Sequence, residues 1–239
     1  MLDTVWFLVI ISLYLGFSFS INNCFDIKED MIGMKRKNPV AMGELDQEKG
    51  IIFSLSLMLA GMFLALLRGL DVFMFYSILV FLSFSYSSPP FRLKSKPFLD
   101  LVSHGLFFGA LIFLFPSFFF SRQVSLLHAL VAISIFYFSI ILELRNLIED
   151  FEHDKKAGLR TTACLLGLDR SKKITYFLSL SYPLTLFPIY YLLGDNAMLL
   201  SFIILTTLFY LLFHFTRSYR ILDVYANISY SLVVLSVVL

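Results

Sequence analysis

The segment Val5–Ile21 reads VWFLVIISLYLGFSFSI, and the polar sequence NNCFDIKED follows it directly as Asn22–Asp30. The first part is an apolar run. Its length is close to the about 20 residues that a helix needs to cross the hydrocarbon core of a bilayer. The second part opens a loop that is rich in carboxylates. The chain therefore combines a predicted membrane-spanning helix with a polar motif at the end of that helix.

Seven further apolar runs of similar length follow the first. The eight predicted spans are Val5–Ile21, Ile51–Leu67, Val72–Ser88, Leu101–Phe120, Val124–Leu142, Ile174–Leu193, Ala197–Phe215 and Val224–Leu239. The 239-residue chain is 59% hydrophobic and only 15% charged, with a mean hydropathy of +0.83, whereas a soluble domain carries about 25% charged residues. We therefore predict an all-α, polytopic transmembrane helical bundle that forms a single domain over residues 1–239.

Basic residues are concentrated in alternate loops. One side of the bundle holds the loops Asn22–Gly50, Pro89–Asp100, Glu143–Lys173 and Thr216–Asp223. These contain 17 of the 19 Lys and Arg residues, and the other side holds Arg68 and Arg122. Because Lys and Arg accumulate in cytoplasmic loops, we predict a multi-pass protein of the cell membrane with these loops in the cytoplasm and both termini outside. The net charge of +2 gives no support for nucleic-acid binding.

Two of the basic loops begin with the same polar pattern, a stripe of side chains spaced i, i+4, i+8. The first stripe is Asn22, Asp26 and Asp30, and the second is Asn146, Asp150 and Asp154. On a helix such residues share one face. Carboxylates so arranged repel one another unless a cation lies between them, and oxygen ligands suit Mg²⁺, which binds a few carboxylates together with substrate phosphates. The alternative interpretation is that the stripes are solvated helix ends with ordinary charge mixing.

Basic side chains follow each stripe. They are Lys35, Arg36 and Lys37 after the first and Lys155, Lys156 and Arg160 after the second. Magnesium and cationic side chains could together neutralise a diphosphate, while an apolar cavity beneath them would accept its hydrocarbon tail.

These motifs resemble those of the UbiA superfamily of intramembrane prenyltransferases. Its NDxxDxxxD motif is similar to Asn22–Asp30, its DxxxDxxxGxxT run to Asp150–Thr161, its YSxPPxRLK loop to Tyr86–Lys94, and its RPIxxG segment to Asn38–Gly43. The resemblance covers essentially the whole chain. Asn23 replaces an Asp of the family pattern and Asn38 replaces an Arg. The family usually has nine spans, so the resemblance implies that its first helix is missing from this chain. The resemblance extends to archaeal-type members of the family.

The resemblance implies transfer of a prenyl group from a prenyl diphosphate, geranyl to geranylgeranyl or longer, to a lipophilic acceptor in the lipid bilayer. The implied metal ligands are Asn22, Asp26, Asp30, Asp150 and Asp154, and the implied catalytic residues are Asp26, Asp150, Asp154 and Tyr86. The implied diphosphate-binding residues are Arg36, Lys37, Arg92, Lys94, Lys155 and Arg160. Magnesium is the expected cofactor.

The acceptor stays open between a quinone or aromatic precursor and a glyceryl phosphate lipid. The second would make the chain resemble a digeranylgeranylglyceryl phosphate synthase, and it would require further cations, for which Arg92, Lys94 and Lys96 are candidates. An alternative of another class is a non-catalytic or transport-type membrane protein. Transporter sites lie near the bilayer midplane, whereas the polar groups here cluster at one surface, which disfavours transport.

Four further polar residues lie near the motifs. Asp100 and His104 begin a predicted span, where ionisable groups are functional candidates, although Asp100 could equally cap its helix. Glu143 and Arg145 flank the second stripe and could pair with each other.

Overall fold

The structure is a computed structural model that describes residues 2–33 and 38–238, and every regular element in these ranges is a helix. The N-terminal half contains α1 (Leu2–Phe25), α2 (Ile27–Ile32), α3 (Gln47–Arg68), α4 (Leu70–Ser87), η1 (Leu93–Ser95), α5 (Leu99–His104), η2 (Gly105–Ala110) and α6 (Leu111–Phe119). The C-terminal half contains α7 (Leu126–Glu149), α8 (Phe151–Ala157), α9 (Thr162–Leu166), α10 (Leu168–Ser181), α11 (Pro183–Leu193), α12 (Asn196–Thr216) and α13 (Tyr219–Val238).

The all-α prediction and the eight predicted spans are confirmed. Within the described residues, eight helical segments are long and apolar enough to cross a membrane. Several helices extend beyond the apolar run that predicted them: α7 continues past Leu142 to Glu149, and α10 begins at Leu168 rather than Ile174. Helical hydrogen bonds do not require apolar side chains, so hydropathy locates a span but does not set the end of its helix.

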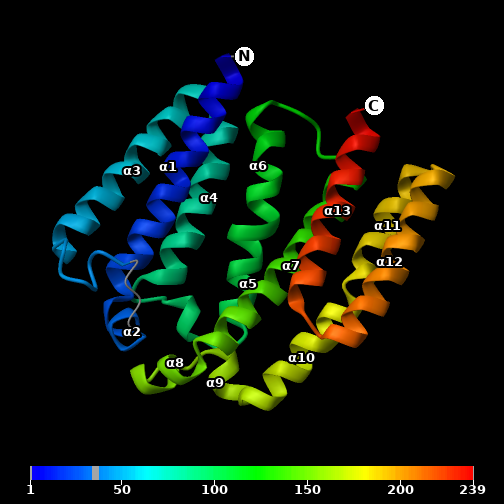
Figure 1. Cartoon of the computed structure of the whole chain (residues 1–239). Coiled ribbons are helices and arrows are strands. Elements are labelled where there is room, and N and C mark those ends of the chain that lie inside the picture. Colours follow the sequence, from blue (N-terminus) through cyan, green and yellow to red (C-terminus); the bar gives the residue numbers. More distant parts are fainter. Residues whose placement is uncertain (1, 34–37, 239) are drawn as a thin grey trace.

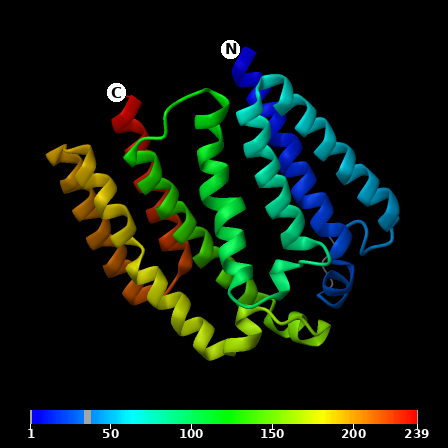
Figure 2. The same cartoon turned by 180° about the vertical axis from the view of Figure 1, so that it is seen from behind.

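The helices form two groups, each with its own buried core (Figure 1). One core joins α1, α3, α4 and the η2–α6 segment, and it includes Tyr14, Phe17 and Phe115. The other joins α7 with α11, α12 and α13, and it includes Tyr182 and Phe209. Figure 2 shows the same two groups from behind, and the η2–α6 segment of the first group packs beside α7 of the second.

A glycine permits the close approach of α3 and α4. A Cβ atom on Gly61 would lie 1.9 Å from the hydroxyl oxygen of Tyr76, whose side chain is fully buried. Any larger residue at this position would displace the Tyr76 ring from the core of the N-terminal group.

The fourth span contains a π-helical segment, η2, between α5 and α6. This segment packs closely on α7, because a Cβ atom on Gly105 would lie 2.8 Å from the ring of Phe136 and one on Gly109 would lie 3.0 Å from Ser139. A π-helical turn changes which side chains face a neighbouring helix, and such turns are frequent at functional sites. The segment therefore changes which side chains between His104 and Ala110 face the space between the two groups.

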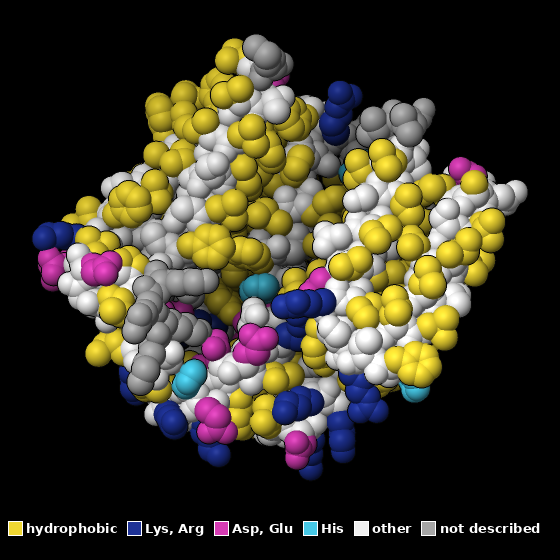
Figure 3. Space-filling model, in the orientation of Figure 1, with side chains coloured by type: hydrophobic (Ala, Val, Ile, Leu, Met, Phe, Trp, Pro, Cys, Tyr) yellow, Lys and Arg dark blue, Asp and Glu magenta, His cyan; other side chains and the backbone are white. Residues whose placement is uncertain are grey.

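Charged side chains gather at one end of the bundle (Figure 3). The short helices α2, α8 and α9 lie at this end, whereas both chain termini lie at the opposite end (Figure 1). The nitrogen Nζ of Lys28 in α2 donates a hydrogen bond of 2.8 Å to the carbonyl of Ala157 at the end of α8. This contact connects the two helical groups at the polar end.

Candidate functional site

A cavity of about 570 Å³ lies between the two helical groups near the polar end of the bundle. Its polar wall includes Asn22, Asp26 and Glu29 from the first motif and Asn146, Glu149, Asp150 and Asp154 from the second. Its apolar wall includes Phe19, Phe107, Phe108 and Leu147. The folded chain thus brings two sequence segments more than a hundred residues apart to one cavity.

The first stripe contains a helix break at its middle residue. Helix α1 ends at Phe25 and α2 begins at Ile27, and between them Asp26 has φ −101° and ψ 13°. The i to i−4 hydrogen bonds nevertheless continue, from the Asp26 amide to the Asn22 carbonyl at 3.0 Å and from the Asp30 amide to the Asp26 carbonyl at 2.9 Å. Asn22 and Asp26 therefore stay on one face, as predicted, and both line the cavity.

Asp30 is the member of the first stripe that does not line the cavity. It accepts a hydrogen bond of 2.8 Å from Nδ2 of Asn38, which also donates to the carbonyl of Asn23 at 2.9 Å. The oxygen of the Asn38 amide accepts from the backbone of Val40 and Ala41. Asn38, the residue that departs from the Arg of the family pattern, thereby fixes the turn at residues 38–41 and holds Asp30.

The second stripe has the same break. Helix α7 ends at Glu149 and α8 begins at Phe151, with φ −86° and ψ 0° at Asp150. The Asp150 amide donates to the Asn146 carbonyl and the Asp154 amide donates to the Asp150 carbonyl, both at 2.9 Å. Here all three members of the stripe line the cavity.

The loop after α4 supplies cations to the first stripe. Lys94 lines the cavity and forms an ion pair with Asp26. Arg92 forms an ion pair with Glu29 and donates to the carbonyl of Phe25 at 3.2 Å, so it stabilises the junction of α1 and α2 from outside the cavity lining.

Burial makes the carboxylate of Asp26 electrostatically costly. Asp26 is only 8% exposed, and this burial raises its pKa, although the neighbouring Lys94 lowers it in part and the charges of Glu29 and Asp30 raise it again. The Oε2 atom of Glu29 is also buried, without a hydrogen-bond partner among the described residues. Excess carboxylate oxygen at a buried position fits the binding of an additional cation.

The donor set has the chemistry that magnesium prefers. Carboxylate and amide oxygens dominate the polar wall, and the described residues contain no group of three His, Cys, Asp or Glu side chains arranged to hold a metal ion by themselves. Mg²⁺ usually keeps several waters and binds through one or two carboxylates together with substrate phosphates. The two stripes fit this mode, in which the substrate completes the coordination.

Among the described residues, the predicted diphosphate-binding cations Lys155 and Arg160 do not line the cavity. Lys155 is exposed, with its Nζ 5.9 Å from the centre of the Phe151 ring, and Arg160 is exposed as well. Arg36 and Lys37 lie outside the described residues.

The predicted loop residue Tyr86 lines the cavity and contacts an acid on the opposite group of helices. Its hydroxyl donates to Oε1 of Glu143 at 2.5 Å. Glu143 is 5% exposed, and its Oε2 lies 3.6 Å from Nε2 of His104 and accepts from Nδ2 of Asn146 at 3.3 Å. Glu143 and His104 both line the cavity, so an acid and an imidazole stand beside the two stripes.

The suggested pairing of Glu143 with Arg145 is wrong. Arg145 instead donates to both carboxylate oxygens of Asp223, at 2.7 and 3.3 Å. Residues two apart on a helix point in different directions, so Glu143 faces the cavity while Arg145 faces α13. The position of Glu143 beside the second stripe was its sequence signal. The π-helical geometry that places Phe107 and Phe108 in the wall had no such signal.

Asp100 has a structural role in this arrangement. Its carboxylate accepts from the Thr162 amide at 2.6 Å and from the Thr162 hydroxyl at 2.5 Å, and it also accepts from the amide of Leu101. It thus attaches the first turn of α5 to α9. It does not cap the helix as suggested, because α5 begins at Leu99 and its N-cap residue is Phe98.

Several known proteins are similar to this chain in sequence. The chain is 29% identical over 170 residues to a digeranylgeranylglyceryl phosphate synthase of Pyrococcus horikoshii, covering 69% of this chain and 57% of that protein. It is 29% identical over 156 residues to a lycopene elongase/hydratase of Haloferax volcanii, covering 65% and 50%. The chain thus spans between half and three fifths of the length of these curated relatives.

The fold is also known from solved structures. A UbiA homologue from Archaeoglobus fulgidus, solved with DMAPP and Mg²⁺, superimposes with a TM-score of 0.75 at 20% identity, over 99% of this chain and 86% of that one. The UbiA prenyltransferase family profile matches residues 2–227. With nearly its whole length matched, this chain belongs to the UbiA prenyltransferase family.

Proposed function

We propose that this protein transfers a prenyl group from a prenyl diphosphate, bound with magnesium in the cavity between α1–α2 and α7–α8, to a lipophilic acceptor. The observation that carries the proposal is the position of both polar stripes on the wall of one cavity, next to an aromatic wall. A family member of the same fold was solved with DMAPP and Mg²⁺, which supports the same ligands here.

Asn22 and Asp26 on one side and Asn146, Asp150 and Asp154 on the other are the proposed magnesium ligands. When bound, magnesium would offset the negative charge that develops on the departing diphosphate. Lys94 would exchange its ion pair with Asp26 for one with the diphosphate, because the metal replaces it at that carboxylate. Asp30, which is held by Asn38, would support the site from behind.

The aromatic wall suits the hydrocarbon part of the substrate. The rings of Phe19 and Phe108 lie 5.6 Å apart and those of Phe107 and Phe108 lie 5.7 Å apart. These rings would exclude water and attract the allylic cation that forms as the bond from C1 to oxygen breaks. An electron-rich acceptor then forms its bond to C1 and releases a proton, which Glu143 or His104 is close enough to the cavity to receive.

Binding and turnover test the proposal separately. Calorimetry with geranylgeranyl diphosphate should give magnesium-dependent binding that is lost in EDTA, and equal affinity in both conditions would contradict the metal-bridged site. Labelled prenyl diphosphates of different length, offered with quinone precursors, aromatic acids and prenylglyceryl phosphates, should then give product with one acceptor class. If no combination of prenyl diphosphate and acceptor gives product although the prenyl diphosphate binds tightly, the protein would be a non-catalytic member of the family.

We further propose that the cavity opens at the cytoplasmic side, since 17 of the 19 basic residues lie in the loops of one side. Both termini would then lie outside. Single cysteines at the exposed positions Met42 and Lys156 should react with an impermeant maleimide only after the membrane is opened, and a cysteine at Asp195 should react in intact cells. The reverse pattern would invert the topology.

A further inference from the structure

A second cavity, of about 480 Å³, lies on the other flank of α7. Helix α10 and the turn between α12 and α13 complete its wall. Its basic and tyrosine lining residues are Arg145, Lys172, Lys173, Arg217, Tyr176 and Tyr219. It is therefore lined by four cations and two phenol rings, in contrast to the carboxylate-rich first cavity.

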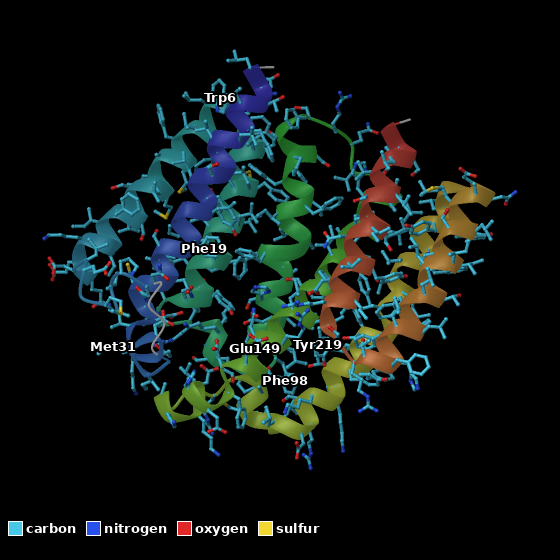
Figure 4. All side chains as sticks on the ribbon, in the orientation of Figure 1. Trp6, Phe19, Met31, Phe98, Glu149 and Tyr219 are labelled. Atoms are coloured by element: carbon cyan, nitrogen blue, oxygen red, sulfur yellow. The ribbon has the colours of Figure 1, made fainter. Side chains whose placement is uncertain are left out.

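The two cavities meet at one residue. Glu149 at the end of α7 lines both. Asn146 and Asp150 face the first cavity, whereas Arg145 and Ile148 face the second. In Figure 4 the labelled Glu149 and Tyr219 lie at the same end of the bundle, where the two helical groups approach each other. A molecule bound in the second cavity is thus separated from the first by the width of the last turn of α7.

The cations of the second cavity are only partly neutralised. Arg145 is paired with Asp223 and lies over the ring of Tyr219 at 4.9 Å. Arg217 follows the last residue of α12 and lies over the ring of Tyr176 at 5.9 Å. Among the described residues, none of Lys172, Lys173 and Arg217 forms an ion pair with a carboxylate. Glu149 is the carboxylate that lines this cavity together with them.

An anion with two negative charges would complete this cavity. Arg and Lys bind phosphate oxygens through charge-assisted hydrogen bonds, and a phosphate monoester carries about two negative charges near neutral pH. Basic pockets between membrane helices at the bilayer surface recognise lipid headgroups. The exposed apolar side chains on the neighbouring spans, among them Phe177 and Phe215, would contact the tail of such a lipid.

We propose that the second cavity binds the phosphate headgroup of a lipid, and that a prenyl acceptor with such a headgroup presents its hydroxyl to the first cavity past Glu149. The acceptor part rests on the proposed function. This assignment replaces the expectation that Arg92, Lys94 and Lys96 bind an acceptor phosphate. Arg92 is paired with Glu29, Lys94 is assigned to the diphosphate in the first cavity, and Lys96 lines neither cavity.

Binding of a model phosphomonoester lipid tests the headgroup site without turnover. Dioctanoyl phosphatidic acid would be titrated into the full chain in a neutral detergent, with dioctanoylglycerol and inorganic phosphate as parallel probes. The Lys173→Gln/Arg217→Gln double variant should weaken phosphatidic acid binding by about tenfold or more, as expected for lost charge-assisted bonds. Lys49→Gln, an exposed lysine paired only with Asp46 across one helical turn, is the matched control and should bind like the parent protein.

Each other outcome counts against a defined part of the proposal. Unchanged phosphatidic acid binding in the double variant would overturn the headgroup site. Equal binding of dioctanoylglycerol would show that the phosphate is not recognised, and equal binding of inorganic phosphate would show that no lipid is required. Magnesium-dependent binding of geranylgeranyl diphosphate should be unchanged in the double variant, and its loss would mean that the two cavities are one site.

Turnover separates an acceptor from a lipid of the surrounding bilayer. With a prenylglyceryl phosphate as acceptor, the double variant should raise the KM for the acceptor by about tenfold and leave kcat unchanged, because it lacks the headgroup contacts but keeps the first cavity. An unchanged KM combined with weakened phosphatidic acid binding would overturn the acceptor role and leave a site for anionic bilayer lipids. If the protein transfers no prenyl group at all, the binding titrations still decide the headgroup site.

Discussion

The two polar stripes have the same spacing and the same backbone break at their middle aspartate, but their surroundings differ. In the first stripe, Asp26 is paired with Lys94 and Asp30 is held by Asn38, so only two of the three members line the cavity. In the second stripe all three members line it. Local sequence thus sets the helical course of a motif, while loops from elsewhere in the chain select which side chains reach the site.

The largest effect is expected from the second stripe. Asp150→Asn keeps the shape of the side chain but removes a charge from the proposed metal site, and a metal of this kind supplies several kcal/mol of transition-state stabilisation. We expect kcat/KM to fall by about a thousandfold, measured with labelled prenyl diphosphate. Asp195→Asn is the control, since Asn can still cap α12 as Asp195 does. Full turnover by Asp150→Asn at saturating magnesium would mean that the second stripe is structural.

Asp26→Asn should reduce transfer by a similar factor but, unlike Asp150→Asn, should also destabilise the ligand-free protein. The change leaves the largely buried ammonium of Lys94 without its carboxylate, at a cost of about 1–3 kcal/mol. Thermal unfolding in EDTA measures this loss. The Asp26→Asn/Lys94→Met double variant should recover stability but not activity. If Asp26→Asn alone left the unfolding temperature unchanged, the two stripes would not differ in their contribution to stability.

Tyr86→Phe tests the contact that joins the two helical groups beside the stripes. It removes the hydrogen bond to Glu143, and a hydrogen bond to a charged group contributes about 1.5–3 kcal/mol. We expect kcat to fall by about tenfold, with little change in magnesium-dependent binding of prenyl diphosphate. Tyr137→Phe, which removes a tyrosine contact to Ser181 away from the cavity, should leave kcat near that of the parent. A loss of binding in Tyr86→Phe would place Tyr86 in the diphosphate site instead.

Asp30→Asn is expected to have the smallest effect. The amide can still bind Asn38, and residue 30 lies outside the cavity lining, so transfer should fall by less than about tenfold if only the charge of a supporting group is lost. A loss as large as that of Asp150→Asn would show that Asp30 becomes a direct metal ligand when substrate binds, and the two stripes would then be equivalent.

Much of the fold follows from local sequence. The apolar runs predicted all eight spans because a helix in lipid must be covered by apolar side chains over a fixed length, and the i, i+4, i+8 spacing predicted the shared faces of both stripes. Residues whose role depends on distant partners were less predictable. Glu143 and Arg145, which flank the second stripe, were expected to pair with each other, yet the first contacts Tyr86 and the second contacts Asp223.

The second cavity had no signal that could be recognised in the sequence. Its cations come from α7, α10 and the turn after α12, and in the sequence each of them is one more basic residue of a polar loop. Only the packing of α10 against α7 brings them together. Likewise, nothing in the apolar run Leu101–Phe120 distinguished the π-helical turn that places aromatic rings in the wall of the first cavity.

The ion pair of Lys94 with Asp26 has a consequence for folding. The ammonium of Lys94 balances the charge of this buried carboxylate from within the chain itself. Folding and membrane insertion would therefore be independent of the magnesium supply. Arrival of a magnesium diphosphate would exchange one cation for another at this carboxylate, and release of the product would return the lysine to its resting partner, ready for the next molecule.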